Sequence, residues 1–335
     1  MELFQQLINA LPGSVSQGLI WGIMAIGVYI TYRILDVADL TVDGSFATGG
    51  AVAVVLIMKG CNLWLAMLLA FIAGLLAGAV TGLLHTFMGI PPILAGILTQ
   101  LSLYSINLKI MGKANQSVNV NQTDLLVSLR WVKEFAFHNP LITVGIVLIV
   151  LIAVLYWFFG TEMGCAIRAT GANMNMSRAQ GINTNFNKVL GIMLSNGLVA
   201  FSGAFLAQYQ GFADVKMGQG SIVIGLAAVI IGEALFGKIF KNFALRLLSV
   251  AFGSIRFFSK LVKPLGVFIR GEREGGCKIV KAVRFSSLCR SVKPKLITAV
   301  AAFSALWLVF VPPCNLFKSR FVMLAIENSR IPRFL

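Results

Sequence analysis

Uninterrupted apolar stretches of about 20 residues constrain this chain more than any other feature of its sequence. The clearest, LITVGIVLIVLIAVLYWFF at 141–159, contains no charged residue. A helix of about 20 apolar residues crosses a hydrocarbon core roughly 30 Å thick. Because such a core has no water to bond backbone groups, segments that cross it as single spans are helices. The sequence therefore predicts an all-α polytopic membrane protein.

Composition supports this fold class across the whole chain. Hydrophobic residues make up 58% of the 335 residues and charged residues 12%, about half the charged share of a typical soluble domain. We expect eight or nine transmembrane helices, and Arg246 and Arg256 weaken the assignment of one of them. The expected helices cover about 15–34, 43–58, 63–87, 89–112, 139–159, 188–209, 219–236, 242–258 and 296–311.

Positive charge is concentrated in the last third of the chain. Residues 1–237 hold 10 Lys or Arg against 9 Asp or Glu, whereas residues 238–335 hold 18 against 3, which gives net charges of +1 and +15. We expect a transmembrane domain at 1–254 and a basic tail at 255–335 that contains the apolar stretch 296–311. A basic segment beside a membrane is typical of contact with anionic lipid, and we expect no nucleic acid partner because no binding motif accompanies the charge.

Three glycines in the expected third helix recur every four residues. Gly74, Gly78 and Gly82 lie in the sequence GLLAGAVTG. This spacing puts them on one face of a helix, and a face without side chains permits close helix packing in lipid. We predict that this face contacts another helix.

Three carboxylates interrupt the apolar pattern between the first two expected helices. The passage RILDVADLTVDGSFATGG contains Asp36, Asp39 and Asp43, a quarter of the chain's 12 acidic residues. Spacings of three and four put them on one helix face if the segment is helical, and Thr41 or Asp43 is a plausible N-cap of the second helix. Two interpretations stay open: the carboxylates line a water-filled path, or they lie in headgroup water and cap helices.

The sequence lacks the motifs that would support an enzymatic function. GEALFGKIF, at 232–240, begins like a phosphate-binding loop, but Ile239 stands where Ser or Thr would hold Mg²⁺, and the motif closes an apolar helix. Patterns typical of serine or zinc hydrolases are absent, and His85 and His138 are not in metal-ligand spacing. We therefore expect no catalytic residues, no metal and no cofactor, and we expect transport.

A polar stretch after the fifth expected helix offers a surface for another protein. It reads GTEMGCAIRATGANMNMSRAQGIN, with Arg168 and Arg178 among small residues. We expect two short helical turns separated by Gly171. A compact loop with exposed arginines and a small-residue surface fits into another protein's groove, and the alternative is a plain basic cytoplasmic loop that follows the positive-inside rule.

The pattern G-x-A-I-R-A-x-G-x-N-x-x-x-x-R-A-x-G-I-N within this stretch resembles the cytoplasmic coupling loop of permease subunits in bacterial ABC importers, of the branched-chain amino acid permease type. RILDVADLTVDGSFATGGAVA, IPPILAGILTQLSLYSINLKIMG and GLAAVIIGEALFG resemble the same family in the same order. The resemblance covers about residues 10–254. It ends near Ile255, where either a divergent tail or a disturbed reading frame accounts for the basic sequence that follows.

The resemblance implies the ABC importer permease fold, a multi-pass location in the bacterial plasma (inner) membrane, and import driven by ATP hydrolysis on separate subunits. It implies ATPase subunits, a periplasmic or lipoprotein substrate-binding protein, a second permease subunit in a homodimer, and surrounding lipid as partners. An amino acid is the expected solute, and a sugar or nucleoside is the alternative. The expected ATPase contact is Glu162, Arg168, Ala169, Gly171, Arg178, Ala179 and Gly181, and the expected pathway residues, polar groups within apolar segments, are Asp43, Ser45, Thr99, Gln100, Tyr104, Asn107, Ser195 and Asn196.

Two other functions compete with this interpretation. An ion-coupled secondary carrier would use Asp36, Asp39, Asp43 or Glu233 as its proton or cation site, and it would need no partner. A membrane scaffold would use the basic tail to bind anionic lipid or a protein, and it would move no solute.

Overall fold

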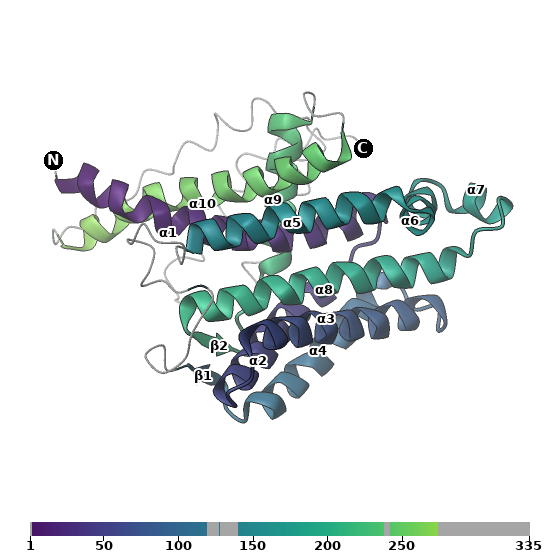
Figure 1. Cartoon of the computed structure of the whole chain (residues 1–335), viewed down its shortest axis with the longest axis horizontal. Helices are drawn as coiled ribbons and strands as arrows, with labels where there is room; N and C mark the ends of the chain where they lie inside the picture. Colours follow the sequence, from purple (N-terminus) through teal and green to yellow (C-terminus); the bar gives the residue numbers. More distant parts are fainter. Residues whose placement is uncertain (1, 119–126, 128–139, 238–241, 274–335) are drawn as a thin grey trace, which may run out of the picture. The chain divides into compact units, whose positions relative to one another are not determined.

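The computed structural model describes residues 2–118, 127, 140–237 and 242–273, which belong to one compact unit of the chain. This unit is helical apart from one short antiparallel ribbon (Figure 1). Within the described ranges the elements are, in chain order, α1 (Glu2–Tyr29), the π-helical turn η1 (Ile30–Ile34), α2 (Thr41–Met58), α3 (Leu63–Thr86), α4 (Pro92–Met111), β1 (Asn115–Ser117), α5 (Pro140–Gly160), α6 (Glu162–Ala172), α7 (Met174–Ala179), α8 (Thr184–Gln210), β2 (Phe212–Asp214), α9 (Ser221–Phe236) and α10 (Phe243–Arg273).

Six segments of the described chain are long and apolar enough to cross a membrane, and α9 is a shorter apolar helix. The expected helices between 15 and 258 all correspond to observed ones, and most of their ends agree to within a few residues. The exceptions are α1 and α8, which begin earlier than expected, and α10, which ends later. The expected helix at 296–311 and most of the basic tail lie outside the described residues. The six segments are Pro12–Ile34, Thr41–Met58, Leu63–Thr86, Pro92–Met111, Leu141–Gly160 and Thr184–Gln210.

Three of these helices form the centre of the unit. In α1, α2 and α8, between 72% and 83% of the most apolar window is buried, against 28% to 33% in α3, α4 and α5. The central helices carry many buried Gly, Ala and Ser residues, which allow backbones to approach one another. The outer helices instead present large exposed apolar side chains such as Trp64, Leu101 and Ile149, as a surface in contact with lipid or a partner does.

The glycine face of α3 packs directly against α8, as the sequence predicts. A Cβ added at Gly74 would lie 2.5 Å from the carbonyl oxygen of Asn196, and one at Gly78 would lie 2.7 Å from that of Ile192. At Gly82 the added atom would lie 3.0 Å from Val189 Cα. The two helix backbones are therefore close along this whole face, and α8 is held in register against α3.

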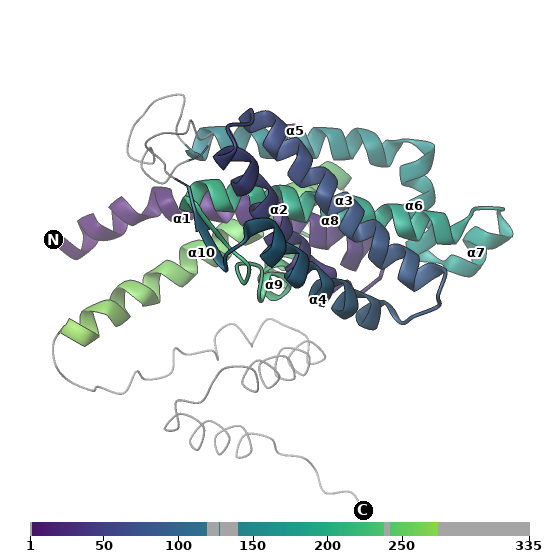
Figure 2. The same cartoon turned by 90° about the horizontal axis from the view of Figure 1, so that it is seen from below.

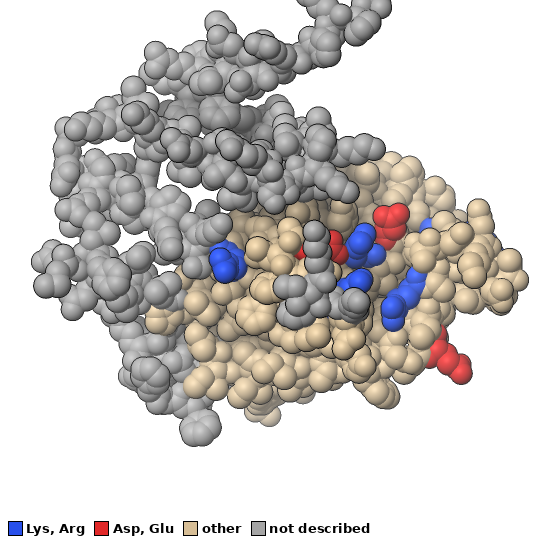
Figure 3. Space-filling view, turned by 90° about the horizontal axis from the view of Figure 1, so that it is seen from above, with Lys and Arg blue, Asp and Glu red and all other residues tan. Residues whose placement is uncertain are grey.

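The two ends of the helical unit differ in structure. Figures 1 and 2 show α6 and α7 at one end and the β1–β2 ribbon at the other. The ribbon pairs Gln116 with Ala213, and the helices expected from the sequence did not include it. On the face drawn in Figure 3, most charged side chains lie toward the end that carries α6 and α7.

Substitution on the glycine face should destabilise the protein. We expect Gly78→Leu to lower the free energy of unfolding by about 1–3 kcal/mol or more, because the new side chain has no space between α3 and α8. Thermal unfolding of the detergent-solubilised protein measures this change. Gly145→Leu in α5 is the matched control, since an added Cβ there meets nothing within 4 Å. Equal midpoints for the two variants would contradict the packing argument.

Candidate functional site

The three carboxylates between α1 and α2 lie in three different environments. The segment 35–40 is not helical, so the three carboxylates do not share one helix face. Asp36 is exposed, with a left-handed backbone (φ 54°) that turns the chain after η1. Asp39 is buried inside the helix bundle, and Asp43 lies half-buried in the first turn of α2.

Asp39 is the centre of a buried hydrogen-bond network that joins α2 to α8. The backbone N–H of Thr41 donates to its Oδ1 at 2.8 Å, and the side-chain amide of Asn196 donates to its Oδ2 at 2.6 Å. Asn196 in turn accepts a bond of 2.6 Å from the hydroxyl of Ser45. Every member of the network is less than 5% exposed, so these bonds replace water that the side chains lose on folding.

Burial also affects the ionisation of Asp39, which lies between two of the membrane-spanning segments. Removal from water raises the pKa of this carboxyl above its usual range, and the hydrogen bonds from Thr41 and Asn196 partly offset the increase. Its partners are hydrogen-bond donors, so the position of Asp39 depends on their geometry.

The prediction that Thr41 or Asp43 is the N-cap of α2 was wrong. The N-cap residue is Leu40, and Asp39 accepts from the N–H of Thr41, the first residue of the helix.

Asp43 binds the beginning of α9. Its Oδ1 accepts from the Ser221 hydroxyl at 2.7 Å and from the Ile222 N–H at 2.9 Å, and its Oδ2 accepts from the Gly220 N–H at 3.0 Å. The first N–H groups of a helix have no partner in the helix itself and favour a negative group. Asp43 therefore caps α9 from another helix and ties α2 to it.

A cavity of about 100 Å³ lies beside Asp43, between α2, α4 and the segment that leads into α9. Four of the eight expected pathway residues line it together: Asp43, Gln100, Tyr104 and Asn107. Gln219, which sequence reasoning did not select, also lines it. Its position in a loop after a short strand gave no signal.

Asn107 has an unusual environment in this cavity. Its side chain is 1% exposed, yet neither its Nδ2 nor its Oδ1 has a hydrogen-bond partner in the described part of the chain. A buried amide without partners costs about 1–3 kcal/mol. A polar group that binds to the cavity wall would remove this cost.

The other four expected pathway residues make contacts within the bundle. Ser45 and Asn196 belong to the Asp39 network. The Thr99 hydroxyl donates to the carbonyl of Ala95 on its own helix, and Ser195 donates to the carbonyl of Gly27 on α1. The Thr99 bond is therefore intrahelical, and only Ser195 joins two helices, α8 and α1.

Glu233 has a simple explanation as part of a surface ion pair. Its Oε1 lies 3.0 Å from Nε of Arg33, and both side chains are more than a third exposed. Exposed pairs of this kind contribute about 0–1 kcal/mol. A cation site at Glu233 therefore gains no support from its surroundings.

The polar stretch after α5 forms two short helices, α6 and α7, but they are not separated where we expected. Gly171 lies within α6, and the break falls at Asn173, whose backbone is extended and whose side chain accepts from the N–H groups of Asn175 and Met176. An Asn at this position caps the second helix, which the sequence interpretation overlooked. Of the expected ATPase-contact residues, Gly171 is partly buried, and the exposed ones are Glu162, Arg168, Ala169, Arg178, Ala179 and Gly181.

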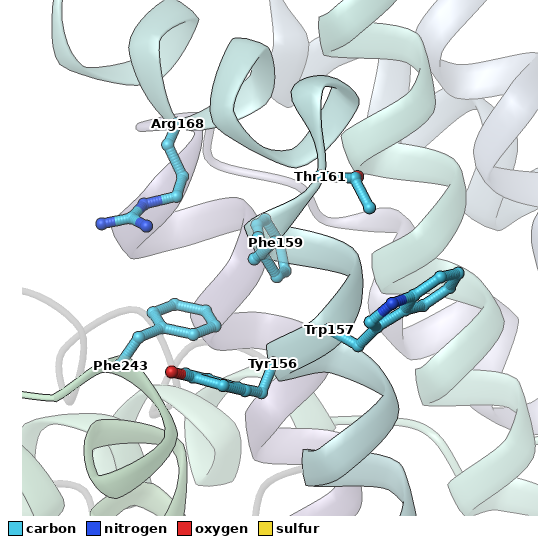
Figure 4. Close-up of a pocket in the computed structure, with 7 residues that line it drawn as sticks. Tyr156, Trp157, Phe159, Thr161, Arg168 and Phe243 are labelled. Atoms are coloured by element: carbon cyan, nitrogen blue, oxygen red, sulfur yellow. The ribbon is translucent and has the colours of Figure 1, made fainter.

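The arginines of this helix pair have partners in the chain. Arg178 donates from Nε to the hydroxyl of Thr184 at 3.0 Å. The guanidinium of Arg168 lies over the ring of Phe243, 5.3 Å from its centroid, at the edge of a cavity of about 430 Å³. Figure 4 shows this arrangement, with Tyr156 on the same side of the cavity as Phe243. The lining is aromatic with one cation and includes none of the expected pathway residues.

A family model and several bacterial proteins match this chain. A family model described as the permease component of the branched-chain amino acid transport system matches residues 11–267. A tyrosine transport system permease protein of Clostridioides difficile (strain R20291) is 41% identical over 224 residues, which cover 67% of this chain and 73% of the relative. An uncharacterized protein of Rickettsia prowazekii (strain Madrid E) is 36% identical, with coverage of 75% and 87%. A ribose import permease protein of Escherichia coli (strain K12) is 29% identical, with coverage of 67% and 69%.

Loss of the Asp43 carboxylate should loosen α9. We expect Asp43→Ala to lower the free energy of unfolding by about 1–3 kcal/mol, because three donors at the start of α9 lose their acceptor. Thermal unfolding in detergent measures this effect. The matched control is Asp36→Asn, which keeps an exposed polar residue able to adopt the left-handed backbone and should change stability by less than about 0.5 kcal/mol. An Asp43 variant as stable as this control would show that the α9 contact contributes nothing.

Proposed function

We propose a solute, a docking surface and a pathway for this chain from one premise: the chain belongs to the family of permease components of branched-chain amino acid transport systems. It is the multi-pass permease subunit of an ABC importer, and the relatives named above are bacterial. It is not itself a catalyst, since ATP is hydrolysed by other subunits of such a transporter. This membership removes the ion-coupled carrier and the scaffold as leading interpretations.

An amino acid is the proposed solute. The observation that carries this proposal is the 41% identity with a protein named for tyrosine transport, which exceeds the 29% identity with the ribose permease over a similar length. Tyrosine is therefore the first solute to test. Import of a sugar is the second candidate, because the sugar permeases match the same two thirds of the chain.

The α6–α7 helix pair is the proposed contact for the ATPase subunits. Exposed apolar side chains, Met163 (46%) and Met176 (63%), stand beside the charged and small residues predicted from the sequence. Large apolar residues exposed in a polar setting are typical of protein interfaces. The Arg168 stack on Phe243 fixes the orientation of one cation at this surface before a partner binds.

The cavity at Asn107 is the proposed position of the solute in this subunit. It contains neutral amides from Gln100, Asn107 and Gln219, each able to donate and to accept, and the hydroxyl of Tyr104. Such groups suit a zwitterionic amino acid, which carries both donors and acceptors. The Asp43 carboxylate is already bonded to α9, so it leaves recognition to the amides.

This cavity must enlarge before it holds a whole solute. Ligand pockets usually measure about 300–1,000 Å³, and this one measures about 100 Å³. Its wall includes Leu101 and Tyr104, whose side chains are 64% and 42% exposed at the outer surface of α4. We propose that a second copy of the chain packs on this outer side.

We also propose that the chain has eight or nine spans in the ABC importer permease fold. A substrate-binding protein, we propose, docks at the end with the β1–β2 ribbon.

Charge reversal on the helix pair should release the ATPase. We expect Arg168→Glu combined with Arg178→Glu to reduce the ATPase that co-purifies from the native membrane by at least about tenfold, a loss of about 1.4 kcal/mol of binding. The matched control is Lys59→Glu with Lys216→Glu, two exposed cations near the opposite, ribbon end. Equal recovery of the ATPase with both double variants would place its contact elsewhere.

The solute and its site are tested together by uptake into proteoliposomes that contain the assembled transporter and its binding protein. We expect labelled tyrosine or leucine to enter and ribose to be excluded. Asn107→Leu should lower uptake by about 5- to 150-fold, as the loss of a polar contact worth about 1–3 kcal/mol does, while the ATPase still co-purifies. Ser102→Ala, an exposed position on the same helix, is the control. Ribose uptake without amino acid uptake would favour the second candidate, and normal uptake by the Asn107 variant would remove Asn107 from the pathway.

A further inference from the structure

The helix α6 lies on the break between α1 and α2 with no space between them. A Cβ added at Gly171 would overlap the carbonyl oxygen of Ile34 and lie 3.0 Å from the Cα of Leu35. The Leu35 side chain then fills the position opposite Gly191 of α8, where an added Cβ would lie 2.9 Å from its Cδ1. Any displacement of α6 toward the bundle therefore acts directly on the backbone at Ile34 and Leu35.

The same break is held at its other end by one polar side chain. Asp39 accepts from Thr41 N–H and from Asn196 Nδ2, and both bonds are at or below 2.8 Å. Burying a carboxylate costs free energy that an apolar residue would not, so its presence in the bundle needs a reason beyond stability. Its hydrogen bonds are directional, and they fix the start of α2 against α8.

The start of α2 is also a wall of the cavity at Asn107. Asp43, Gly44 and Ala47 line it. Gly44 lies so close to α4 that an added Cβ would be 3.1 Å from the Cα of Gln100. A shift of α2 relative to α4 therefore changes the size of the cavity.

We propose that the segment Ile34–Thr41 is the mechanical link between α6 and the cavity, and that Asp39 is a positioning residue whose bond to Asn196 makes the link stiff. Movement of α6 pushes on Ile34 and on Leu35, which packs at Gly191 of α8, and the Asp39–Asn196 bond makes the start of α2 move together with α8 relative to α4. Packed, bonded elements of this kind pass a displacement on because they hold discrete arrangements. The inference rests on the proposed role of α6 as ATPase contact and of the cavity as solute position.

The π-helical turn η1 agrees with this role. Leu35 N–H donates to the carbonyl of Ile30 and Val37 N–H to that of Thr31, both at 3.0 Å, so the wide turn continues into the break. Single π-helical turns are frequent at functional sites. The turn lies where α6 would push.

The test breaks the Asp39–Asn196 bond and then restores it with the two side chains exchanged. Asp39→Leu replaces the carboxylate by a larger apolar side chain with the same number and branching of heavy atoms. In the double variant Asp39→Asn with Asn196→Asp, the new amide at position 39 donates to the new carboxylate at position 196. That carboxylate still accepts from Ser45, and the position-39 carbonyl still accepts from Thr41, whereas the bond that Asn196 donates to the carbonyl of Ile192 is lost.

Three quantities are measured for each variant in proteoliposomes: co-purified ATPase, ATP hydrolysis stimulated by the loaded binding protein, and solute molecules imported per ATP. We expect Asp39→Leu to assemble and to hydrolyse ATP within about twofold of wild type, with about tenfold fewer solute molecules imported per ATP. The exchanged pair should recover import per ATP to within about threefold of wild type. A residue with a merely structural role would lower assembly and hydrolysis together and would not change this ratio.

Two results would overturn the link. Unchanged import per ATP in Asp39→Leu would show that Asp39 does not carry the movement. Equal loss of import per ATP in Asp39→Leu and in the exchanged pair would show that the hydrogen bond is not what matters. Failure of the proposed function is distinguishable from both results, because wild type would then retain no ATPase or import no amino acid. The number of solute molecules imported per ATP is measured with whichever solute wild type imports.

Discussion

The carboxylate of Asp39 needs donors inside the bundle, and much of the arrangement around it follows from that need. A buried carboxylate without partners costs several kcal/mol, so a backbone N–H and an amide side chain must both reach it. The N–H comes from Thr41, which fixes where α2 begins, and the amide comes from Asn196, which fixes how α8 lies against α2. The non-helical segment between α1 and α2 is thus held in place by the hydrogen bonds of the Asp39 side chain and not by a continuous helix.

Close packing of α3 on α8 places Asn196 where the carboxylate requires it. The Gly74 and Gly78 positions lie against the carbonyls of Asn196 and Ile192, so α8 is held along one face by α3 while its other side meets α1 and α2. Water does not drive helices together in a membrane, and dispersion contacts between smooth surfaces take over that role. A polar network is therefore held within a bundle assembled mainly by small residues.

The candidate site shows where sequence reasoning succeeds and where it ends. Gln100, Tyr104 and Asn107 were predicted to line the pathway because they are polar residues within an apolar helix. Their helical spacing brings all three to one cavity. The same criterion selected Thr99 and Ser195, because the sequence does not show that their hydroxyls bond to nearby carbonyls. The predicted break at Gly171 was wrong: the break falls at Asn173, and Gly171 is needed for the close approach of α6 to Ile34.

The sequence by itself determined the helical membrane fold class, the approximate positions of the described helices and the family, because apolar length and ordered motifs are properties of the chain read in order. Only the tertiary structure decided the different roles of the three carboxylates. Asp36 lies in a turn, Asp39 belongs to a buried hydrogen-bond network, and Asp43 caps α9. It also decided that Gln219 meets Asn107 in one cavity and that α6 rests on Ile34. These outcomes depend on groups from residues distant along the chain, and a hydrogen bond or a close contact exists only where the fold brings both partners together.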